Sequence, residues 1–228
     1  MARKALGSRA VGLHLGLLVV VACGVAGVAP RAAGHGGEGV WEGSAGVAIL
    51  NQAAGGNRVL HDGLGPNALA RLDRDILAQS GVAWLLVFEG VNDIGTAEPT
   101  EAAQKQVTAD LIAAYEQIVV RAHAQGIRVV YGATLTPFGG NTGYDDAAGY
   151  REASRQAVNR WIRTSGRFDA VVDFDRAARD PRQPARLLTA IDVGDHLHLN
   201  PAGYQLLADA VPARLFQLQP DQGDFGLE

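Results

Sequence analysis

The chain has 228 residues, a length that accommodates one domain, or one domain with a tail, and excludes a multi-domain machine. Hydrophobic residues make up 47% and charged residues 19%, which excludes intrinsic disorder, collagen-like repeats and coiled coils as descriptions of the whole chain. The formal net charge is -4 and the body has no basic cluster, so nucleic acid is excluded as the expected partner. A single cysteine, Cys23, excludes an intrachain disulfide framework and a multi-thiolate zinc site.

Residues 1–45 form an apolar leader followed by a Gly-rich linker. Three basic residues among the first nine precede an apolar stretch from Val11 to Val28, which is the layout of an export signal. A membrane anchor and a non-native leader, produced by a shifted or wrongly started reading frame, are the alternatives. The segment Val20–Cys23 also resembles a bacterial lipoprotein cleavage box, which would put a lipid on Cys23. We therefore expect a secreted or cell-envelope protein that meets a membrane only through such a signal or lipid anchor.

Strands alternate with helices through residues 46–216, which we expect to form one domain followed by a tail at 217–228. The expected strands are Val47–Leu50, Trp84–Phe88, Arg128–Ala133 and Ala170–Phe174, and the expected helices begin near Asn67, Thr100, Ala147 and Pro201. The short, continuous apolar runs favour buried strands over helices. The alternation predicts a three-layer α/β/α sandwich around a mostly parallel, flavodoxin-like doubly wound sheet. In such sheets, sites form at the C-terminal ends of the strands.

Apolar residues at helical spacing predict the buried faces of two helices. In the helix that begins at Thr100 and ends near Gly126, the stripe consists of Val107, Leu111, Tyr115, Ile118, Val119 and Ala122. In the helix over residues 147–165, the expected inward residues are Ala153, Ala157, Trp161 and Ile162.

The first candidate motif, Gly55-Gly56-Asn57-Arg58, follows the first strand of the domain. Glycine there permits a positive φ and lets a backbone N–H face a ligand without a side chain in the way. An ordinary turn between a strand and a helix would use the same residues, so this motif alone is not specific. Neither of the glycine patterns typical of nucleotide phosphate sites follows this strand.

The second motif, Gly90-Val91-Asn92-Asp93, follows the most apolar strand. The Asn92 amide can donate hydrogen bonds, and a donor aimed at a developing oxyanion contributes about 3 kcal/mol to a transition state. Asn-Asp turn chemistry is the alternative reading. The position at the end of a central strand favours a functional role, because sites form at that edge.

The third motif, Asp195-His196-Leu197-His198, precedes the last helix. An imidazole that acts as a general base needs an acceptor for its second nitrogen, and Asp195, three residues before His198, can supply one. His196 is an alternative base, although its place next to Asp195 should direct it elsewhere. A metal site formed by Asp192, Asp195, His196 and His198 and a purely structural loop are further alternatives.

In this order and at these strand ends, the three motifs resemble those of the SGNH, or GDSL, hydrolases, a family of esterases and lipases. The resemblance covers about residues 46 to 216. It matches Gly56 and Asn92 to the family's oxyanion-hole residues, and Asp195 and His198 to its D-x-x-H pair. It implies that His198 is the base, that Asp195 orients it, and that an acyl-enzyme forms on a serine. The resemblance implies no metal and no organic cofactor.

The resemblance also implies a substrate class. The Gly and Asn motifs look most similar to those of secreted bacterial members, some of which deacetylate plant polysaccharides, so a small-molecule or carbohydrate ester is the expected partner. Asn57, Arg58 and Asp93, beside the oxyanion residues, are the expected substrate-binding residues. The segments Asn57 to Pro66 and Thr136 to Asp146 are expected to line the pocket. The sequence leaves the oligomeric state open.

One block of that family is missing, because the sequence contains no Gly-Asp-Ser. Ser8 and Ser44 precede Gly56 but lack the strand and sharp turn that such a nucleophile requires, and Cys23 is a substitute candidate. The family's first strand is then absent or replaced, for instance by Leu17 to Cys23, since unpaired backbone groups would otherwise be left inside the sheet. Two explanations compete: a truncated or frame-shifted gene product, or an inactive relative that binds without cleaving.

Overall fold

The computed structural model describes residues 20–24, 47–212 and 215. Apart from residues 20–24, the expected export signal and Gly-rich linker lie outside the described residues, as does the expected tail at 217–228. Within the described ranges, no helix is both long enough and apolar enough to cross a bilayer. Export, lipidation and location therefore stay predictions.

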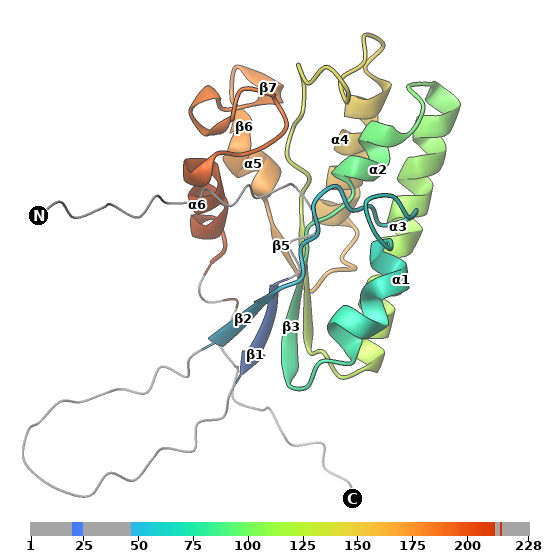
Figure 1. Ribbon diagram of the computed structural model, residues 1–228, viewed down its shortest axis with the longest axis vertical. Helices are drawn as coiled ribbons and strands as arrows, with labels where there is room; N and C mark the ends of the chain where they lie inside the picture. Colours follow the sequence, from blue (N-terminus) through green and yellow to red (C-terminus); the bar gives the residue numbers. More distant parts are fainter. Residues whose placement is uncertain (1–19, 25–46, 213–214, 216–228) are drawn as a thin grey trace, which may run out of the picture.

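Five strands form the main sheet in the order β2-β1-β3-β4-β5 (Figure 1). Their bounds are Val20–Gly24 for β1, Val47–Asn51 for β2, Val82–Val87 for β3, Val129–Ala133 for β4 and Ala170–Val172 for β5. The last three run parallel to one another, whereas β1 is antiparallel to both of its neighbours. The expectation of an α/β fold with a parallel sheet is confirmed by β3, β4 and β5.

Strand β1 lies between β2 and β3, where members of the SGNH family have the strand that precedes the Gly-Asp-Ser segment. It pairs Val20 with Leu86 and Cys23 with Val82, so it runs from the C-terminal end of β3 toward its start. Cys23 therefore lies beside the start of β3, whereas Asn92 follows the C-terminal end of the same strand. This separation argues against Cys23 as a substitute nucleophile.

The expectation that Val47–Leu50 is a buried strand is wrong. Within the described residues β2 pairs only with β1 and forms one edge of the sheet. Ile49 and Leu50 are 63% and 38% exposed, although neighbouring residues on a strand point to opposite faces. Both faces of β2 therefore lack the cover that the apolar run had suggested.

Helices lie on both sides of the sheet (Figure 1). One side carries α1 (Ala68–Leu72), which continues as a π-helical turn over Asp73–Leu77, together with α3 (Glu101–Ala124) and α4 (Tyr150–Thr164). The other side carries α5 (Phe174–Ala178) and α6 (Pro201–Asp209). Three of the four expected helix starts are confirmed, since the side chains of Asn67, Thr100 and Asn200 each accept a hydrogen bond from a backbone N–H in the first turn. The helix expected from Ala147 begins later, at Tyr150. The pattern did not reveal α2 (Val91–Thr96), α5, a hairpin of β6 (Arg179–Asp180) and β7 (Gln183–Leu187), or the 3-10 turn Thr189–Ile191.

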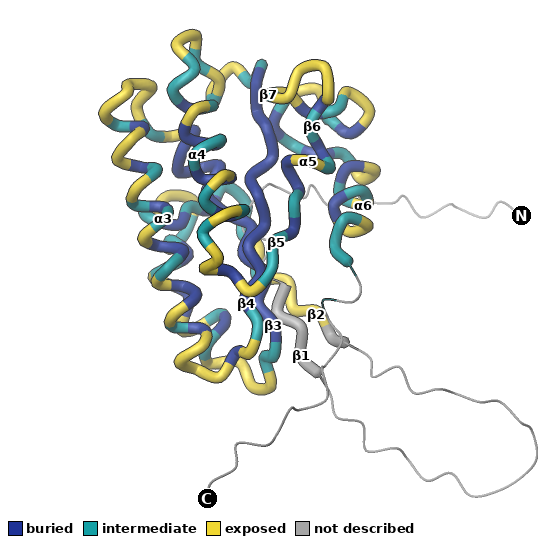
Figure 2. Tube along the Cα trace, turned by 180° about the vertical axis from the view of Figure 1, so that it is seen from behind, coloured by how far each residue is buried: buried dark blue, intermediate teal, exposed yellow. Residues whose placement is uncertain are grey.

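Buried residues gather along the centre of the sheet and on the helix faces turned toward it (Figure 2). The stripe expected on α3 is confirmed, because all six of its residues are buried. The face expected for α4 is confirmed only in part: Ile162 is buried and Trp161 packs against the core, but Ala153 is exposed, whereas Arg155 and Asn159 are fully buried. Arg155 forms an ion pair with buried Asp175 at 2.5 Å, and Asn159 bonds both backbone groups of Leu135. These partners turn a polar face of α4 inward.

Candidate active site

The Asp195–His198 motif lies in a loop that is closed at its base. Asp192 and Leu199 form an isolated antiparallel bridge, and the Val193 N–H donates to the His198 carbonyl at 3.1 Å. Asp195 Oδ1 accepts the backbone N–H groups of Leu197 and His198 at 3.0 and 2.8 Å. The bridge and these bonds fix the carboxylate beside the imidazole.

His198 Nδ1 lies 2.5 Å from Asp195 Oδ2. Burial pushes the pKa of Asp195 up, but the His198 N–H and imidazole together with the Leu197 N–H hold that pKa below its ordinary value. Asp195 is therefore ionised at neutral pH and accepts the Nδ1 proton. In the neutral imidazole the lone pair is then on Nε2, the atom that would take a proton from a nucleophile.

A second pair lies beside the first. His196 Nδ1 is 2.7 Å from Asp192 Oδ2, while Asp192 Oδ1 accepts the N–H groups of Gly194 and His196. His196 has φ 63, and it is the non-glycine residue with positive φ in the described part of the chain. In the sequence, the feature that indicates this second pair is the four-residue spacing of Asp192 and His196 in a loop that contains glycine. The loop thus holds two separate Asp–His pairs, and no group of three or more His, Cys, Asp or Glu among the described residues is arranged to hold a metal ion.

Asn92 lies in the first turn of α2, a helix that the sequence did not predict. Gly90, which precedes the helix, has φ 123, and a Cβ there would lie 2.5 Å from the Tyr115 hydroxyl. Glycine is therefore required for the sharp entry from β3 into α2. The Asn92 side chain is buried, with Nδ2 donating to the Asn57 carbonyl at 2.7 Å and Oδ1 accepting from the Tyr144 hydroxyl at 2.8 Å.

Asp93 ties α2 to the segment that follows the Gly motif. Its two carboxylate oxygens accept the backbone N–H groups of Val59 and Leu60 at 2.8 and 2.9 Å. Burial raises the pKa of Asp93 above its ordinary value despite these bonds. The carboxylate that was expected to bind substrate is thus engaged with the backbone.

The Gly motif forms a turn at the same edge. Gly56 has φ +69, a backbone conformation that calls for glycine, and a Cβ there would meet only the exposed, flexible side chain of Leu64. Asn57 is buried, and its side chain donates to the Pro66 carbonyl at 2.8 Å and accepts from Arg71 Nε at 3.0 Å. Asn57 therefore shapes the turn from within.

Arg58, the third expected substrate-binding residue, spans two segments. Its guanidinium donates to Thr96 Oγ1 at 3.3 Å and to the Asp62 carbonyl. Arg58 thus links the end of α2 to the segment that follows the Gly motif.

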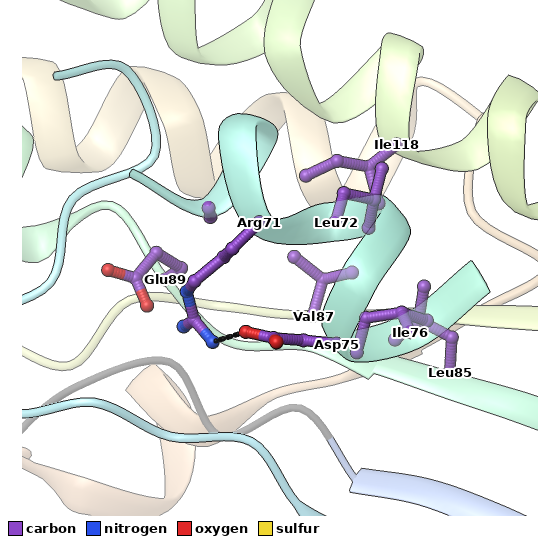
Figure 3. Close-up of a pocket in the computed structure, with 9 residues that line it drawn as sticks. Arg71, Leu72, Asp75, Ile76, Leu85, Val87, Glu89 and Ile118 are labelled. Atoms are coloured by element: carbon purple, nitrogen blue, oxygen red, sulfur yellow. Dashed lines mark hydrogen bonds and ion pairs between the residues drawn. The ribbon is translucent and has the colours of Figure 1, made fainter. Parts of the chain in front are cut away.

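Arg71 supports the turn from below (Figure 3). Its Nη1 donates to the Gln52 carbonyl at 2.8 Å and to Asp75 at 3.0 Å, and Figure 3 shows the guanidinium between the carboxylates of Glu89 and Asp75. The cavity that these side chains line has a volume of about 10 Å³, room for at most one water molecule. This cavity is too small for an ester substrate, and the role of Arg71 beside it is to support the Gly turn.

The segment between β4 and α4 connects the motifs. Asn141 Nδ2 donates to the Asp195 carbonyl at 2.8 Å, and Asn141 Oδ1 accepts the Tyr144 N–H at 2.9 Å. The Tyr144 hydroxyl in turn donates to Asn92. Hydrogen bonds therefore run from the Asp–His loop through this segment to Asn92 and on to Asn57. The sequence predicted that residues 136–146 line the pocket but did not identify Asn141 or Tyr144, because neither belongs to a recognisable motif.

The Asp195–His198 pair, the buried Asn92 carboxamide and the Gly56 turn all lie near the C-terminal ends of the parallel strands. This combination of fold and groups defines an α/β protein of the hydrolase class. Comparison with protein families then gives the particular group: the chain belongs to the GDSL-like lipase/acylhydrolase family, whose pattern matches residues 23–206. The resemblance stated from the motifs is confirmed.

Solved structures show the same fold. A candidate acylhydrolase from Bacteroides fragilis matches with a TM-score of 0.50 and 21% identity, covering 68% of this chain and 68% of its own. Axe2, an acetylxylan esterase from Geobacillus stearothermophilus, matches with a TM-score of 0.50 and 20% identity, covering 71% of this chain and 68% of its own. A comparison with curated protein sequences gives no match.

Proposed function

We propose that this site hydrolyses carboxylic esters, with His198 as the general base and Asp195 as the carboxylate that orients it. The observation that carries the proposal is the 2.5 Å contact between His198 Nδ1 and Asp195 Oδ2, in a loop that hydrogen bonds connect to Asn92. Such a pair leaves Nε2 as the proton acceptor. Membership of an acylhydrolase family supports the same reaction class.

In the proposed reaction, a nucleophile attacks the ester carbonyl while His198 Nε2 takes its proton. The carbonyl oxygen becomes an oxyanion, which receives hydrogen bonds from the Gly56 N–H and the Asn92 amide. His198 then returns the proton to the leaving alcohol, and a water molecule, deprotonated by His198 in the same way, releases the acid. None of these steps uses a metal or an organic cofactor.

In the family that the motifs resemble, the nucleophile is a serine in a Gly-Asp-Ser segment, which this sequence lacks. Without that serine, a water molecule activated by His198 is the nucleophile left to the site, and enzymes whose triad is disabled reach only about 10³ to 10⁴-fold catalysis over water. We therefore propose weak hydrolysis for the chain as it stands. The second candidate is a module that binds esters without cleaving them, and the missing segment is the observation that favours it.

The proposed substrate is an acetylated carbohydrate. The motifs look most similar to those of secreted bacterial members, some of which deacetylate plant polysaccharides, and Axe2, which shares the fold, is an acetylxylan esterase. The leader supports the same choice, because a secreted or envelope-bound protein would meet such a substrate outside the cell.

Hydrolysis of p-nitrophenyl acetate by the full chain tests the proposal. His198→Ala should remove the activity above the rate in buffer, whereas His196→Ala is a matched control that removes the neighbouring Asp-paired imidazole and should retain it. Activity that survives His198→Ala and disappears with His196→Ala would make His196 the base. A wild type that binds acetylated xylo-oligosaccharides in calorimetry but releases no acetate would establish the binding module instead.

A further inference from the structure

Tyr144 lies against the helix that carries Asn92. A Cβ on Gly95 would lie 2.2 to 2.5 Å from three ring carbons of Tyr144, so the ring fills the space that a side chain at position 95 would need. The Phe138 ring meets the Tyr144 ring edge-on, with centroids 6.2 Å apart. Gly95 is thus the small residue of α2 that allows the Tyr144 hydroxyl to reach back one turn to Asn92.

The hydrogen bonds of Asn92 determine which way its amide faces. The Asn57 carbonyl can only accept, so the group 2.7 Å from it must be Nδ2. Oδ1 then faces Tyr144, whose hydroxyl must donate across the 2.8 Å contact. Burial raises the pKa of Tyr144, which keeps the hydroxyl protonated and able to donate at neutral pH.

Tyr144 is itself held in place from the Asp–His loop. Asn141 Oδ1 accepts the N–H groups of Gly143 and Tyr144, both at 2.9 Å, while Asn141 Nδ2 donates to the Asp195 carbonyl. The residue that faces Asn92 and the residue that orients His198 therefore share one partner. A displacement of this segment would disturb both sides of the site together.

We propose that Tyr144 is a positioning residue that fixes the Asn92 carboxamide in the orientation needed to stabilise an oxyanion, with Gly95 making room for its ring. Its catalytic consequence rests on the proposed function. Its structural consequence rests on the contacts alone, so the two can be tested separately.

The structural arm uses Tyr144→Phe, which removes the hydroxyl and keeps the ring on Gly95. The probe is the side-chain NH₂ signal of Asn92 in ¹H–¹⁵N spectra of the full chain, assigned by its loss in Asn92→Asp. We expect the signal to move and its exchange with solvent to rise about tenfold, the effect of one lost hydrogen bond. The matched control is Tyr131→Phe, which removes a hydroxyl that donates to the Leu215 carbonyl and should leave the signal in place. An unchanged signal in Tyr144→Phe would overturn the proposal.

The kinetic arm uses p-nitrophenyl acetate with the same variants. Tyr144→Phe should lower kcat about tenfold and leave KM within about twofold, because the oriented amide acts on the transition state and not on the bound ester. Gly95→Ala should lower kcat to the same extent, and the double variant should be no worse than either single one, since both act through one contact. Additive losses, or a loss confined to KM, would refute the positioning role. A wild type without hydrolysis would count against the proposed function, and the Asn92 signal would still decide the structural claim.

Discussion

Replacing Asp93 by asparagine tests whether this buried carboxylate holds the Gly segment to α2. Both oxygens of the carboxylate accept backbone N–H groups, from Val59 at 2.8 Å and from Leu60 at 2.9 Å. An asparagine keeps the shape but has a single acceptor oxygen, so its NH₂ must face one of the two N–H groups. One donor in the site is then left without an acceptor.

The size of the effect follows from these two bonds. A hydrogen bond to a charged acceptor contributes roughly 1.5 to 3 kcal/mol, and an unsatisfied buried N–H costs roughly 1 to 3 kcal/mol. The neutral amide avoids the burial of a charge, which offsets part of this loss. We expect Asp93→Asn to lower the free energy of unfolding at neutral pH by about 2 kcal/mol, which shifts the urea midpoint by about 1 M.

The pH dependence of this difference has a definite sign. Because burial raises the pKa of Asp93, the folded protein binds its proton at a pH where the unfolded chain has released it. The contribution of this group to stability is therefore present below the unfolded pKa of about 3.9 and is lost as the pH rises through the folded pKa. Asparagine does not titrate, so the stability gap between wild type and variant should be wider near about pH 4 than at neutral pH.

Urea unfolding followed by circular dichroism measures the gap at both pH values. Asp209→Asn makes the same chemical change at an exposed position on α6 and should leave the midpoint unchanged. If Asp93→Asn behaves like this control, or if its stability gap to wild type widens as the pH rises, Asp93 does not hold the Gly segment to α2.

Three further predictions follow from single contacts. Arg155→Met should cost about 3 kcal/mol in urea unfolding, because it leaves the buried Asp175 carboxylate without its nearest partner; no loss would contradict the ion pair. Burial raises the pKa of Asp173, but the Arg163 guanidinium keeps that pKa below its ordinary value. The stability that this carboxylate contributes to the fold is therefore lost as the pH falls through the lowered pKa. Asp173→Asn should then converge with wild type in acid unfolding curves. Gly56→Ala should lower thermal stability and ester hydrolysis together, because the φ of +69 at this position is strained for any residue with a Cβ, and a variant with unchanged melting would contradict the tight turn.

The parts of the fold that could be predicted are those in which short-range patterns agree with tertiary contacts. Strand β3 is a continuous apolar run covered on both faces, and every residue of the α3 stripe is buried where helical spacing placed it. Helix α2 escaped prediction because Gly90 and the Asn92–Asp93 pair are typical of turns. The same residues begin a helix here because Gly90 takes a positive φ and Asp93 finds backbone partners in a distant segment.

The face of α4 shows a different limit. The expected inward face is met at Trp161 and Ile162 but not at Ala153. Arg155 and Asn159 are buried as well, because Asp175 and Leu135 satisfy their polar groups. Those partners lie about 20 residues or more away in the sequence, so no local pattern contains them. For the site, motif spacing was enough to pair Asp195 with His198, whereas Tyr144 and Asn141 became visible only through their contacts.

The reversed direction of β1 bears on the missing nucleophile. A gap between β2 and β3 would leave two rows of backbone N–H and C=O groups unpaired, so any short β-prone segment gains by filling it, and antiparallel pairing serves as well as parallel pairing. Val20–Gly24 meets that need by backbone bonding alone, so its presence in the sheet does not identify it as the strand of an intact family member. A strand that carried the nucleophile would have to run parallel to β3, so that its C-terminal end reached the edge where Asn92 lies. Translating the DNA before codon 46 in all frames decides the matter: an apolar strand followed by Gly-Asp-Ser there would refute the binding module and assign β1 to a replaced segment.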